Sequence, residues 1–303
     1  MYESVKSSKK NDDTISISSV LDKLDASKSG YYDYLKRGPS KTKIRRERIT
    51  EEVKRIHKES FEIYGSPKIT SELLNLGEKV SQRFVHQIMK ENNLKAKYIK
   101  PWTKTMISID FSSRLENLLN RHFNPTKPDC AWCTDITYIW TQTDGFVYLT
   151  SVMDLFSRKI IAWVLTKTME AEEVLRCIEI AKERRNIKNP LVIQSDRGVQ
   201  FTLAKYAEIT SKMITSYSHK GTPWDNACIE SFHALIKREW LNFYKIEDYN
   251  HAPKLIFEYI ESFYNTIRIH SHCGYLSPNN YEKQFALKLT NSNNTTYLTN
   301  SVI

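Results

Sequence analysis

The chain has 303 residues and a formal net charge of +10, with 40% hydrophobic and 12% aromatic residues. This composition excludes an intrinsically disordered chain and is typical of a folded protein with room for two domains. No apolar run approaches the length of about 18 residues that a transmembrane helix needs, and no secretory leader opens the sequence. We therefore expect a cytoplasmic protein without a membrane partner.

The positive charge is concentrated in the N-terminal third. Residues 1–110 hold 23 Lys and Arg against 15 Asp and Glu, a surplus of +8 that leaves +2 for the remainder. A basic excess of this kind suits a polyanionic partner, so nucleic acid is favoured.

The five cysteines are too few and too scattered for a disulfide framework, and we expect free thiols. Cys130 and Cys133 form a C-x-x-C pattern, but no second pair of cysteines completes a structural zinc site. The pattern also runs into a strand-like segment rather than opening a helix, which disfavours a redox motif. We interpret these two residues as structural.

Helices are expected after a polar stretch over 1–13 that we predict to be disordered. An amphipathic helix is predicted over 15–24, the segment 29–37 follows it, and Gly38 and Pro39 end this part. A charged helix follows over 41–58. Its inward stripe is expected to comprise Ile44, Ile49, Val53 and Ile56.

Two short helices then surround a turn that contains glycine. The turn over 64–67 opens the first, with Pro67 at its first position and Ile69, Leu73 and Leu74 inward. Ser81 caps the second, over 82–92, whose inward residues are Val85, Ile88 and Met89 and whose outward residues include Gln82, Arg83 and His86. The pattern predicts a helical, helix-turn-helix-like DNA-binding region over 14–94, and an ordinary helical hairpin is the alternative. The local positive charge favours DNA.

A basic linker over 95–128, with a brief helix over 111–123, leads to an α/β unit over 129–285. Strands are predicted over 132–140, 146–153 and 159–165, with a hairpin turn at Asp144 and Gly145. A helix over 170–185, a buried strand over 191–193, a helix over 202–211 and a weak strand over 213–217 follow. A helix after Asp225 and another over 252–269 precede a polar tail over 286–303. This order predicts a mixed sheet flanked by helices.

The helix after Asp225 is organised around one carboxylate. Asp225 is a good N-cap residue and is expected to fix where the helix begins. Four polar residues then recur at helical spacing along one stripe: Asn226, Glu230, His233 and Lys237. A solvated helix face is the alternative interpretation of this stripe.

Three acids are predicted to converge. Asp135 stands in the middle of a strand, Asp196 follows the buried strand at the end where α/β sheets bind ligands, and Glu230 reaches both from its helix. A set of carboxylates without Cys or His favours Mg²⁺ or Mn²⁺, and two such ions would bracket a scissile phosphate. The alternative is three unrelated acids, each with a local partner. Arg197, Lys220 and Lys237 lie nearby in sequence and would offset phosphate charge.

Residues 132–138, 194–201 and 224–232 resemble the three acidic motifs of bacterial insertion-sequence transposases with a retroviral-integrase-like core. Residues 29–36 and 64–69 resemble the N-terminal region of the second-frame product of two-frame elements. The C-terminal signature of that product is matched by Tyr264, Asn265, Arg268, His270, Gly274, Pro278, Tyr281 and Glu282. The resemblance covers roughly residues 29–285.

This resemblance implies a ribonuclease-H-like fold and Mg²⁺-dependent cleavage and joining of DNA strands at the element ends. It also implies a metal-binding triad of Asp135, Asp196 and Glu230, and a DNA contact by Lys237, seven positions after the glutamate. Further DNA contacts are expected from the stripe, the neighbouring cations and the second short helix: Asn226, His233, Arg197, Lys220, Gln82, Arg83 and His86.

Two departures from the family pattern stand out. Asp196 and Glu230 enclose 33 residues where most relatives have 35, and Cys273 replaces a usual leucine. The first-frame product, as fusion or partner, is expected to add another DNA-binding domain, and action on two ends favours a homo-oligomer. The rivals are a nuclease of the same fold, which would cleave without joining, and a non-catalytic DNA-binding regulator.

Overall fold

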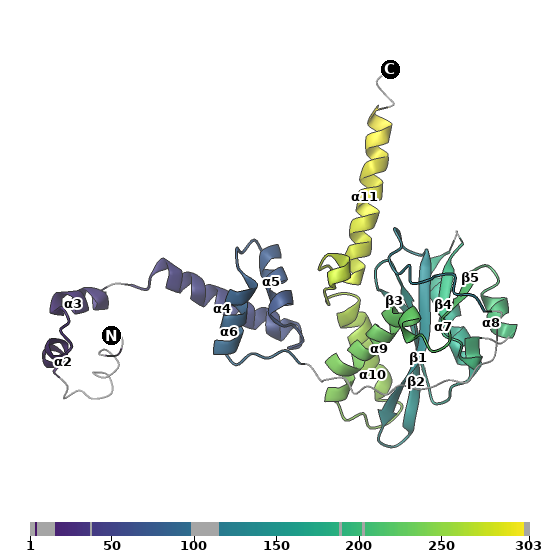
Figure 1. Cartoon of the computed structure of the whole chain (residues 1–303), viewed down its shortest axis with the longest axis horizontal. Coiled ribbons are helices and arrows are strands. Elements are labelled where there is room, and N and C mark those ends of the chain that lie inside the picture. The colour runs from purple at the N-terminus through teal and green to yellow at the C-terminus, as the bar shows by residue number, and fades with distance from the viewer. Residues whose placement is uncertain are drawn as a thin grey trace. The chain divides into compact units, whose positions relative to one another are not determined.

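The computed structural model describes residues 4, 16–36, 38–97, 115–187, 190–201 and 204–299 (Figure 1). The chain divides into two compact units, Met1–Arg55 and Ile56–Ile303. The stretch over 1–13 lies outside the described residues except for residue 4, so its predicted disorder is not tested.

The first unit begins with two short helices, α2 (Ile17–Lys23) and α3 (Lys28–Lys36). Ser16 caps α2 by accepting a hydrogen bond from the Ser19 backbone N–H. Leu21 and Tyr31 form a small buried cluster. The helix predicted over 15–24 is therefore confirmed.

Helix α4 (Lys41–Glu59) confirms the charged helix, although one residue of its inward stripe is wrong. Ile49, Val53 and Ile56 are buried at helical spacing, whereas Ile44 is 51% exposed. Ile44 precedes Ile49 by five residues, which at about 100° per residue places it about 140° around the helix from Ile49. Ile44 therefore lies well away from the buried face.

The two short helices are α5 (Ser66–Asn75) and α6 (Gln82–Glu91). Ser81 caps α6 as predicted, since its side chain accepts a hydrogen bond from Phe84 N at 3.2 Å. The predicted inward residues of both helices are buried except Leu74, which is 53% exposed. The buried face of α5 runs through Ile69 and Leu73, and Leu74 is rotated by about 100° from that face.

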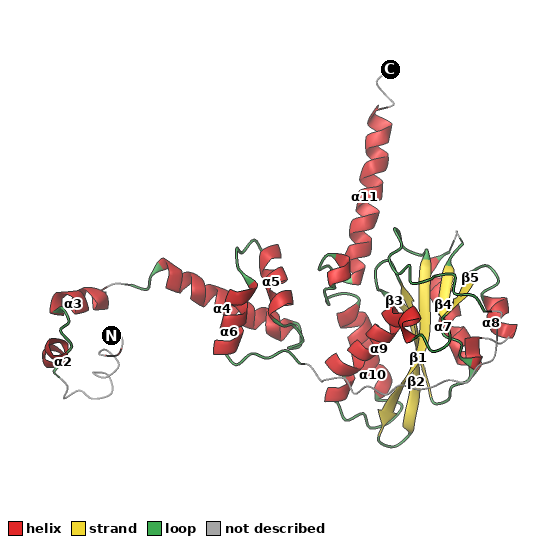
Figure 2. Cartoon of the chain, in the orientation of Figure 1, coloured by secondary structure: helices red, strands yellow, loops and turns green. Residues whose placement is uncertain are grey.

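One five-stranded mixed sheet forms the centre of the second unit (Figure 2). Its strands, in the order β3-β2-β1-β4-β5, are β3 (Ile160–Thr166), β2 (Gly145–Asp154), β1 (Ala131–Thr141), β4 (Val192–Ser195) and β5 (Ile214–Tyr217). The first three strands are antiparallel, and β4 and β5 run parallel to β1. The predicted order of strands and helices is confirmed.

Helices cover both faces of this sheet. On one face, α7 (Ala171–Arg185) and α8 (Ala204–Ile209) pack on a core that includes Trp132 and Val152. Because alternate residues of a strand point to opposite faces, Asp135 and Ser151 point away from that core. Helix α9 (Ala227–Glu239) covers their face.

The predicted helix over 111–123 is wrong for the described residues 115–123, which are not helical. We call residues 115–121 the strap, because this segment runs beside β5. Glu116 O accepts a hydrogen bond from Tyr217 N at 2.9 Å, and Leu119 N donates to Ser216 Oγ at 2.8 Å. Residues 98–114 of the expected linker lie outside the described part of the chain.

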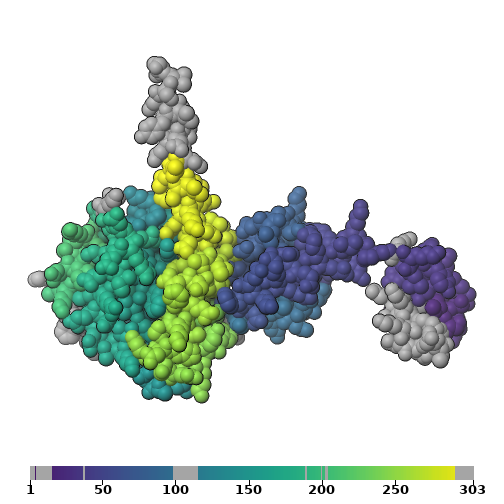
Figure 3. Space-filling view, turned by 180° about the vertical axis from the view of Figure 1, so that it is seen from behind, coloured from purple at the N-terminus to yellow at the C-terminus, as the bar shows by residue number. Residues whose placement is uncertain are grey.

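The C-terminal elements differ from prediction in two places. The helix expected over 252–269 consists of α10 (Ala252–Phe257) and a π-helical segment, η4 (Glu258–Tyr264). Helix α11 (Pro278–Thr299) continues past residue 286, where a polar tail was expected. The Glu282 carboxylate accepts hydrogen bonds from Arg185 and from Ser157 Oγ, and this contact fastens the start of α11 to the core. Figure 3 shows the yellow-green C-terminal residues against the teal core.

Short 3₁₀ segments among the described residues are η1 (Val199–Phe201), η2 (Pro223–Asn226), η3 (Leu241–Phe243) and η5 (Ser271–Cys273). All five cysteines are free. Among the described helices, none has the length and apolar character required to cross a membrane.

Candidate active site

The register of the parallel strands brings two of the predicted acids together. Cys133 of β1 pairs with Gln194 of β4, and Asp135 and Asp196 each stand two residues beyond that pair. Both strands run in the same direction, so the two carboxylates follow the same edge of the sheet. Asp135 is half-buried, and Asp196 is exposed just after the end of β4.

Glu230 approaches these acids from the first turn of α9. The helix is held against the sheet by Ile229, Phe232 and Ile236, which are buried, and this leaves Glu230 on the open side. Desolvation, followed by the charges of Asp135 and Asp196, raises the pKa of Glu230 to about 7. Desolvation and the Asp135 carboxylate raise the pKa of Asp196 to about 6. The three acids therefore form one electrostatically coupled group.

The chemistry of this group fits a divalent cation. All three side chains offer hard oxygen donors, which Mg²⁺ and Mn²⁺ prefer. Desolvation, with mutual repulsion as the second cause, raises two of the pKa values, and a bound cation would offset both effects. Among the described residues, no three acidic, His or Cys side chains stand close enough to enclose an ion as they are. An ion would therefore have to draw the carboxylates closer together.

Two residues of the predicted polar stripe lie inside the protein. His233 is 5% exposed, with Nδ1 3.4 Å from Asp135 Oδ2 and Nε2 3.3 Å from Ser151 Oγ. Asn226 is 3% exposed, and its Nδ2 donates to Thr134 O at 3.1 Å. Both side chains are buried, with His233 facing β1 and β2 and Asn226 Nδ2 bonded to β1, and a DNA contact by either residue stays a prediction.

Lys237 lies beside the acids at the far end of the stripe. Its Nζ donates to Thr137 Oγ1 at 2.7 Å and lies 4.4 Å from the centroid of the Tyr138 ring. Burial lowers the pKa of Lys237 to about 8, and the Asp135 carboxylate opposes that shift. Its cation is thus held close to the acidic group while it remains partly accessible.

Arg197 and Lys220, the other cations predicted near the acids, lie in other surroundings than Lys237. Arg197 is half-buried and donates from Nε to Ser218 O at 2.9 Å and from Nη2 to Leu115 O at 3.0 Å. This guanidinium thus ties the loop after β5 to the strap. Lys220 is exposed in the same loop. In the helical region, Gln82, Arg83 and His86 are exposed on the outer face of α6, as predicted.

The start of α9 differs from its prediction. Asp225 belongs to a 3₁₀ turn, η2 (Pro223–Asn226), and the N-cap position is taken by Asn226, whose side chain makes no capping hydrogen bond. Asp225 is instead 1% exposed and accepts hydrogen bonds from the strap. The sequence interpretation missed these partners, Asn117 and Arg121, because they lie more than 100 residues away in a segment predicted to be helical.

Comparisons with known proteins agree with this architecture. Models of the integrase core domain match residues 125–222 and 211–278, and a model of the HTH-like domain matches residues 45–102. The HTLV-2 integrase catalytic core domain in complex with magnesium (trimeric form) covers 52% of this chain and 98% of its own length. It has 17% sequence identity to this chain and a TM-score of 0.40.

Two curated relatives match most of the chain. The transposase for insertion sequence element IS904 of Lactococcus lactis subsp. lactis (strain IL1403) is 36% identical over 250 residues, 82% of this chain and 98% of the relative. The transposase InsF for insertion sequence IS3A of Escherichia coli (strain K12) is 31% identical over 276 residues, 89% of this chain and 94% of the relative. The predicted transposase family, mixed-sheet fold and helix-turn-helix-like region are confirmed. The chain belongs to the IS3 family of insertion-sequence transposases, with an integrase core domain and an HTH-like domain.

Proposed function

We propose that this transposase uses Asp135, Asp196 and Glu230 to cleave and rejoin DNA strands at the ends of its element with Mg²⁺ or Mn²⁺. The observation that carries the proposal is the register of β1 and β4, which sets Asp135 beside Asp196, together with the electrostatic coupling of Glu230 to both. Two bound ions would activate the attacking oxygen and stabilise the leaving oxygen of the phosphodiester. Water attacks the phosphodiester at an element end and displaces the 3′ oxygen, and the freed 3′ hydroxyl then attacks another phosphodiester and displaces the 3′ oxygen there, so that the strands are joined.

The neighbouring side chains support this chemistry without entering it. His233 lies between Asp135 and Ser151 and orients the carboxylate that it faces. Lys237 places a cation next to the acids and offsets the charge of an incoming phosphate. Arg83 and His86 on α6 are positioned on an exposed helix face for reading the terminal repeats.

The partners follow from the same proposal. Terminal-repeat DNA and target DNA are the substrates, and the first-frame product adds DNA recognition as a fusion or as a partner. Pairing of two ends implies a homo-oligomer on DNA. The reaction takes place in the bacterial cytoplasm, where the element resides.

The test is strand cleavage and joining of labelled element-end DNA with Mg²⁺, by the chain alone and by the chain fused to the first-frame product. Asp135→Asn is expected to lower the cleavage rate by at least on the order of 10²–10³-fold, because an electrostatic element of catalysis is removed, while DNA affinity is retained. The matched control is Asp144→Asn in the β1–β2 turn, whose side chain is 27% exposed and is paired with Lys167. It should retain full activity.

Three results would contradict the proposal in different ways. Unchanged cleavage by Asp135→Asn would refute the triad. Cleavage without joining by the wild-type fusion would indicate the nuclease, and DNA binding without any reaction in either form would indicate the regulator.

A further inference from the structure

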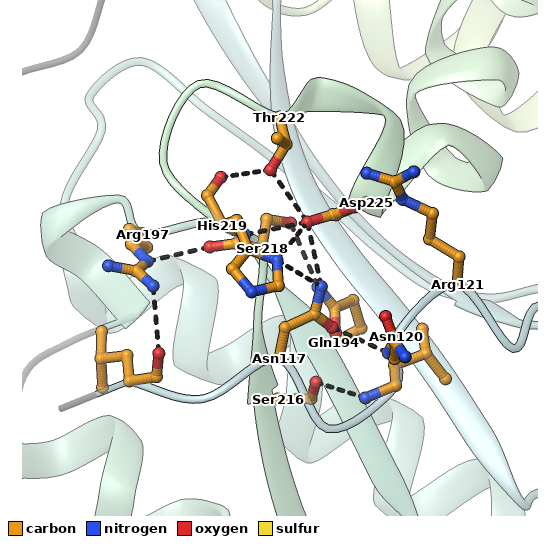
Figure 4. Close-up of polar contacts among 12 residues, drawn as sticks. Asn117, Asn120, Arg121, Gln194, Arg197, Ser216, Ser218, His219, Thr222 and Asp225 are labelled. Atoms are coloured by element: carbon orange, nitrogen blue, oxygen red, sulfur yellow. Dashed lines mark hydrogen bonds and ion pairs between the residues drawn. The ribbon is translucent and has the colours of Figure 1, made fainter. Parts of the chain in front are cut away.

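The Asp225 carboxylate is buried and accepts hydrogen bonds from two other segments of the chain (Figure 4). From the strap, Arg121 Nε donates to Oδ1 at 2.6 Å, and Asn117 Nδ2 donates to Oδ2 at 2.9 Å. From the loop after β5, His219 N donates to Oδ2 at 3.0 Å, and Thr222 Oγ1 lies 2.8 Å from the same oxygen. We call these five residues the Asp225 clamp.

The strap makes further hydrogen bonds to the core outside this clamp. Its backbone is bonded to β5 through Glu116 and Leu119, and Arg197 links Leu115 to Ser218. Asn117 also closes a turn by accepting from Asn120 N at 2.9 Å. The strap is therefore a fixed part of the core, and the clamp connects it to the start of α9.

Helix α9 needs such an external attachment. No side chain caps its N-terminus, so its first turn is not fixed by its own sequence. Asp225 attaches this point to the strap, and the adjacent Asn226 attaches it to β1 through Thr134 O. Thr134 is the neighbour of Asp135 on β1. The two attachments thus fix the rotation of α9 about its axis relative to β1, the strand that carries Asp135.

We infer that Asp225 is a positioning residue, which orients Glu230 toward Asp135 and Asp196 by holding the start of α9 against the strap. This inference rests on the proposed function, in which Glu230 is a metal ligand. Glu230 follows Asp225 by five residues, along a 3₁₀ turn that leads straight into a helix. A shift of the clamp is therefore transmitted to the glutamate, and a misplacement of about 1 Å lowers rates by on the order of 10²-fold.

The surroundings of the carboxylate exclude a simpler role as a fourth metal ligand. Burial alone would raise the pKa of Asp225, but the His219 backbone N–H and the Arg121 guanidinium hold it well below its ordinary value. Asn117, His219 and Thr222 direct polar atoms at Oδ2, and the Arg121 guanidinium at Oδ1 would repel a metal cation. The negative charge of Asp225 is therefore used to accept the hydrogen bonds of the clamp.

The test compares Asp225→Asn with Glu282→Gln. Both replace a shielded carboxylate that accepts from one arginine and one hydroxyl, but Glu282 fastens α11 rather than α9. Asp225→Asn is expected to lower the kcat of strand cleavage about 10–100-fold, with the KM for element-end DNA within about twofold of the wild type. Glu282→Gln is expected to lose about as much thermal stability as Asp225→Asn and yet to keep the wild-type kcat.

A second readout needs no catalysis. Lys220 is exposed in the loop that the clamp holds, so trypsin should cleave after it faster in metal-free Asp225→Asn than in wild type or Glu282→Gln. Arg121→Gln reaches the same contact from the strap, where the Arg121 side chain is 50% exposed, and should act in the same direction with less damage to folding.

A kcat within twofold of wild type, or an equal fall in Glu282→Gln, would overturn the inference. Unchanged proteolysis in both clamp variants would do so as well. An inactive wild-type protein would overturn the proposed function instead, and the proteolysis would still decide whether Asp225 holds the loop.

Discussion

The buried ion pair at the end of α9 offers a direct test of how this helix is stabilised. Glu239 is the last residue of α9, and it accepts hydrogen bonds from Arg268 Nε at 2.7 Å and Nη2 at 2.6 Å. The Tyr259 hydroxyl also donates a hydrogen bond to Glu239 Oε2, at 2.8 Å. The side chains of Arg268 and Glu239 are only 7% and 11% exposed. Glu239→Ala therefore leaves a buried guanidinium without its partner.

The expected loss is about 3–5 kcal/mol of unfolding free energy, because an uncompensated buried charge is far more costly than a broken surface pair. The double variant Glu239→Leu with Arg268→Met removes both charges and should regain part of that loss. Glu172→Ala is the matched control, since its pair with Lys205 is 65% and 62% exposed. It should leave the denaturation midpoint unchanged.

Urea denaturation followed by circular dichroism measures these differences. A loss below about 1 kcal/mol for Glu239→Ala would refute the reasoning, since the value would then be that of an exposed pair. A double variant less stable than Glu239→Ala would also refute it, because the buried charge would not be the cause.

Three further predictions follow from other parts of the fold. Asn265→Ala removes both side-chain bonds to the Ile160 backbone and should lower the unfolding free energy by about 1–3 kcal/mol per unpaired group, measured by denaturation with exposed Asn280→Ala as control. Burial raises the pKa of Asp154 to about 7, whereas the unfolded chain has a value of about 4. Between these two pH values the folded state binds more protons than the unfolded state, so stability falls as pH rises. Asp154→Asn should flatten that slope in a pH series of melting curves, and an unaltered slope would count against the assignment. Arg83→Ala should weaken binding to terminal-repeat DNA and reduce the salt slope of log affinity by about 0.9 in gel shifts, whereas Arg176→Ala on α7 should not.

The sheet could be predicted from sequence because its signals are local. The Asp144-Gly145 turn joins two strands of alternating pattern, and the apolar run before Asp196 is typical of a buried parallel strand. The register that sets Asp135 beside Asp196 follows from those strands. The acids were therefore predictable as a group.

The strap and the clamp were not predictable in this way. Residues 115–121 have no periodic pattern that distinguishes an extended segment from a short helix, and their conformation depends on bonds to β5. Asp225 has the sequence features of an N-cap, but its partners, Asn117 and Arg121, come from far along the chain. Long-range contacts override local preference here, as they do for the buried His233.

The short spacing between the second and third acids has a structural explanation in these attachments. Asp196 and Glu230 enclose 33 residues, but the position of Glu230 does not depend on the length of that segment. Asp196 is fixed by the pairing of β4 with β1, and α9 is fixed independently, by Asp225 to the strap and by Asn226 to β1. The intervening residues need only connect two points that are already set. A change of loop length is therefore tolerated as long as both attachments remain, whereas loss of either attachment should misplace the glutamate at any loop length.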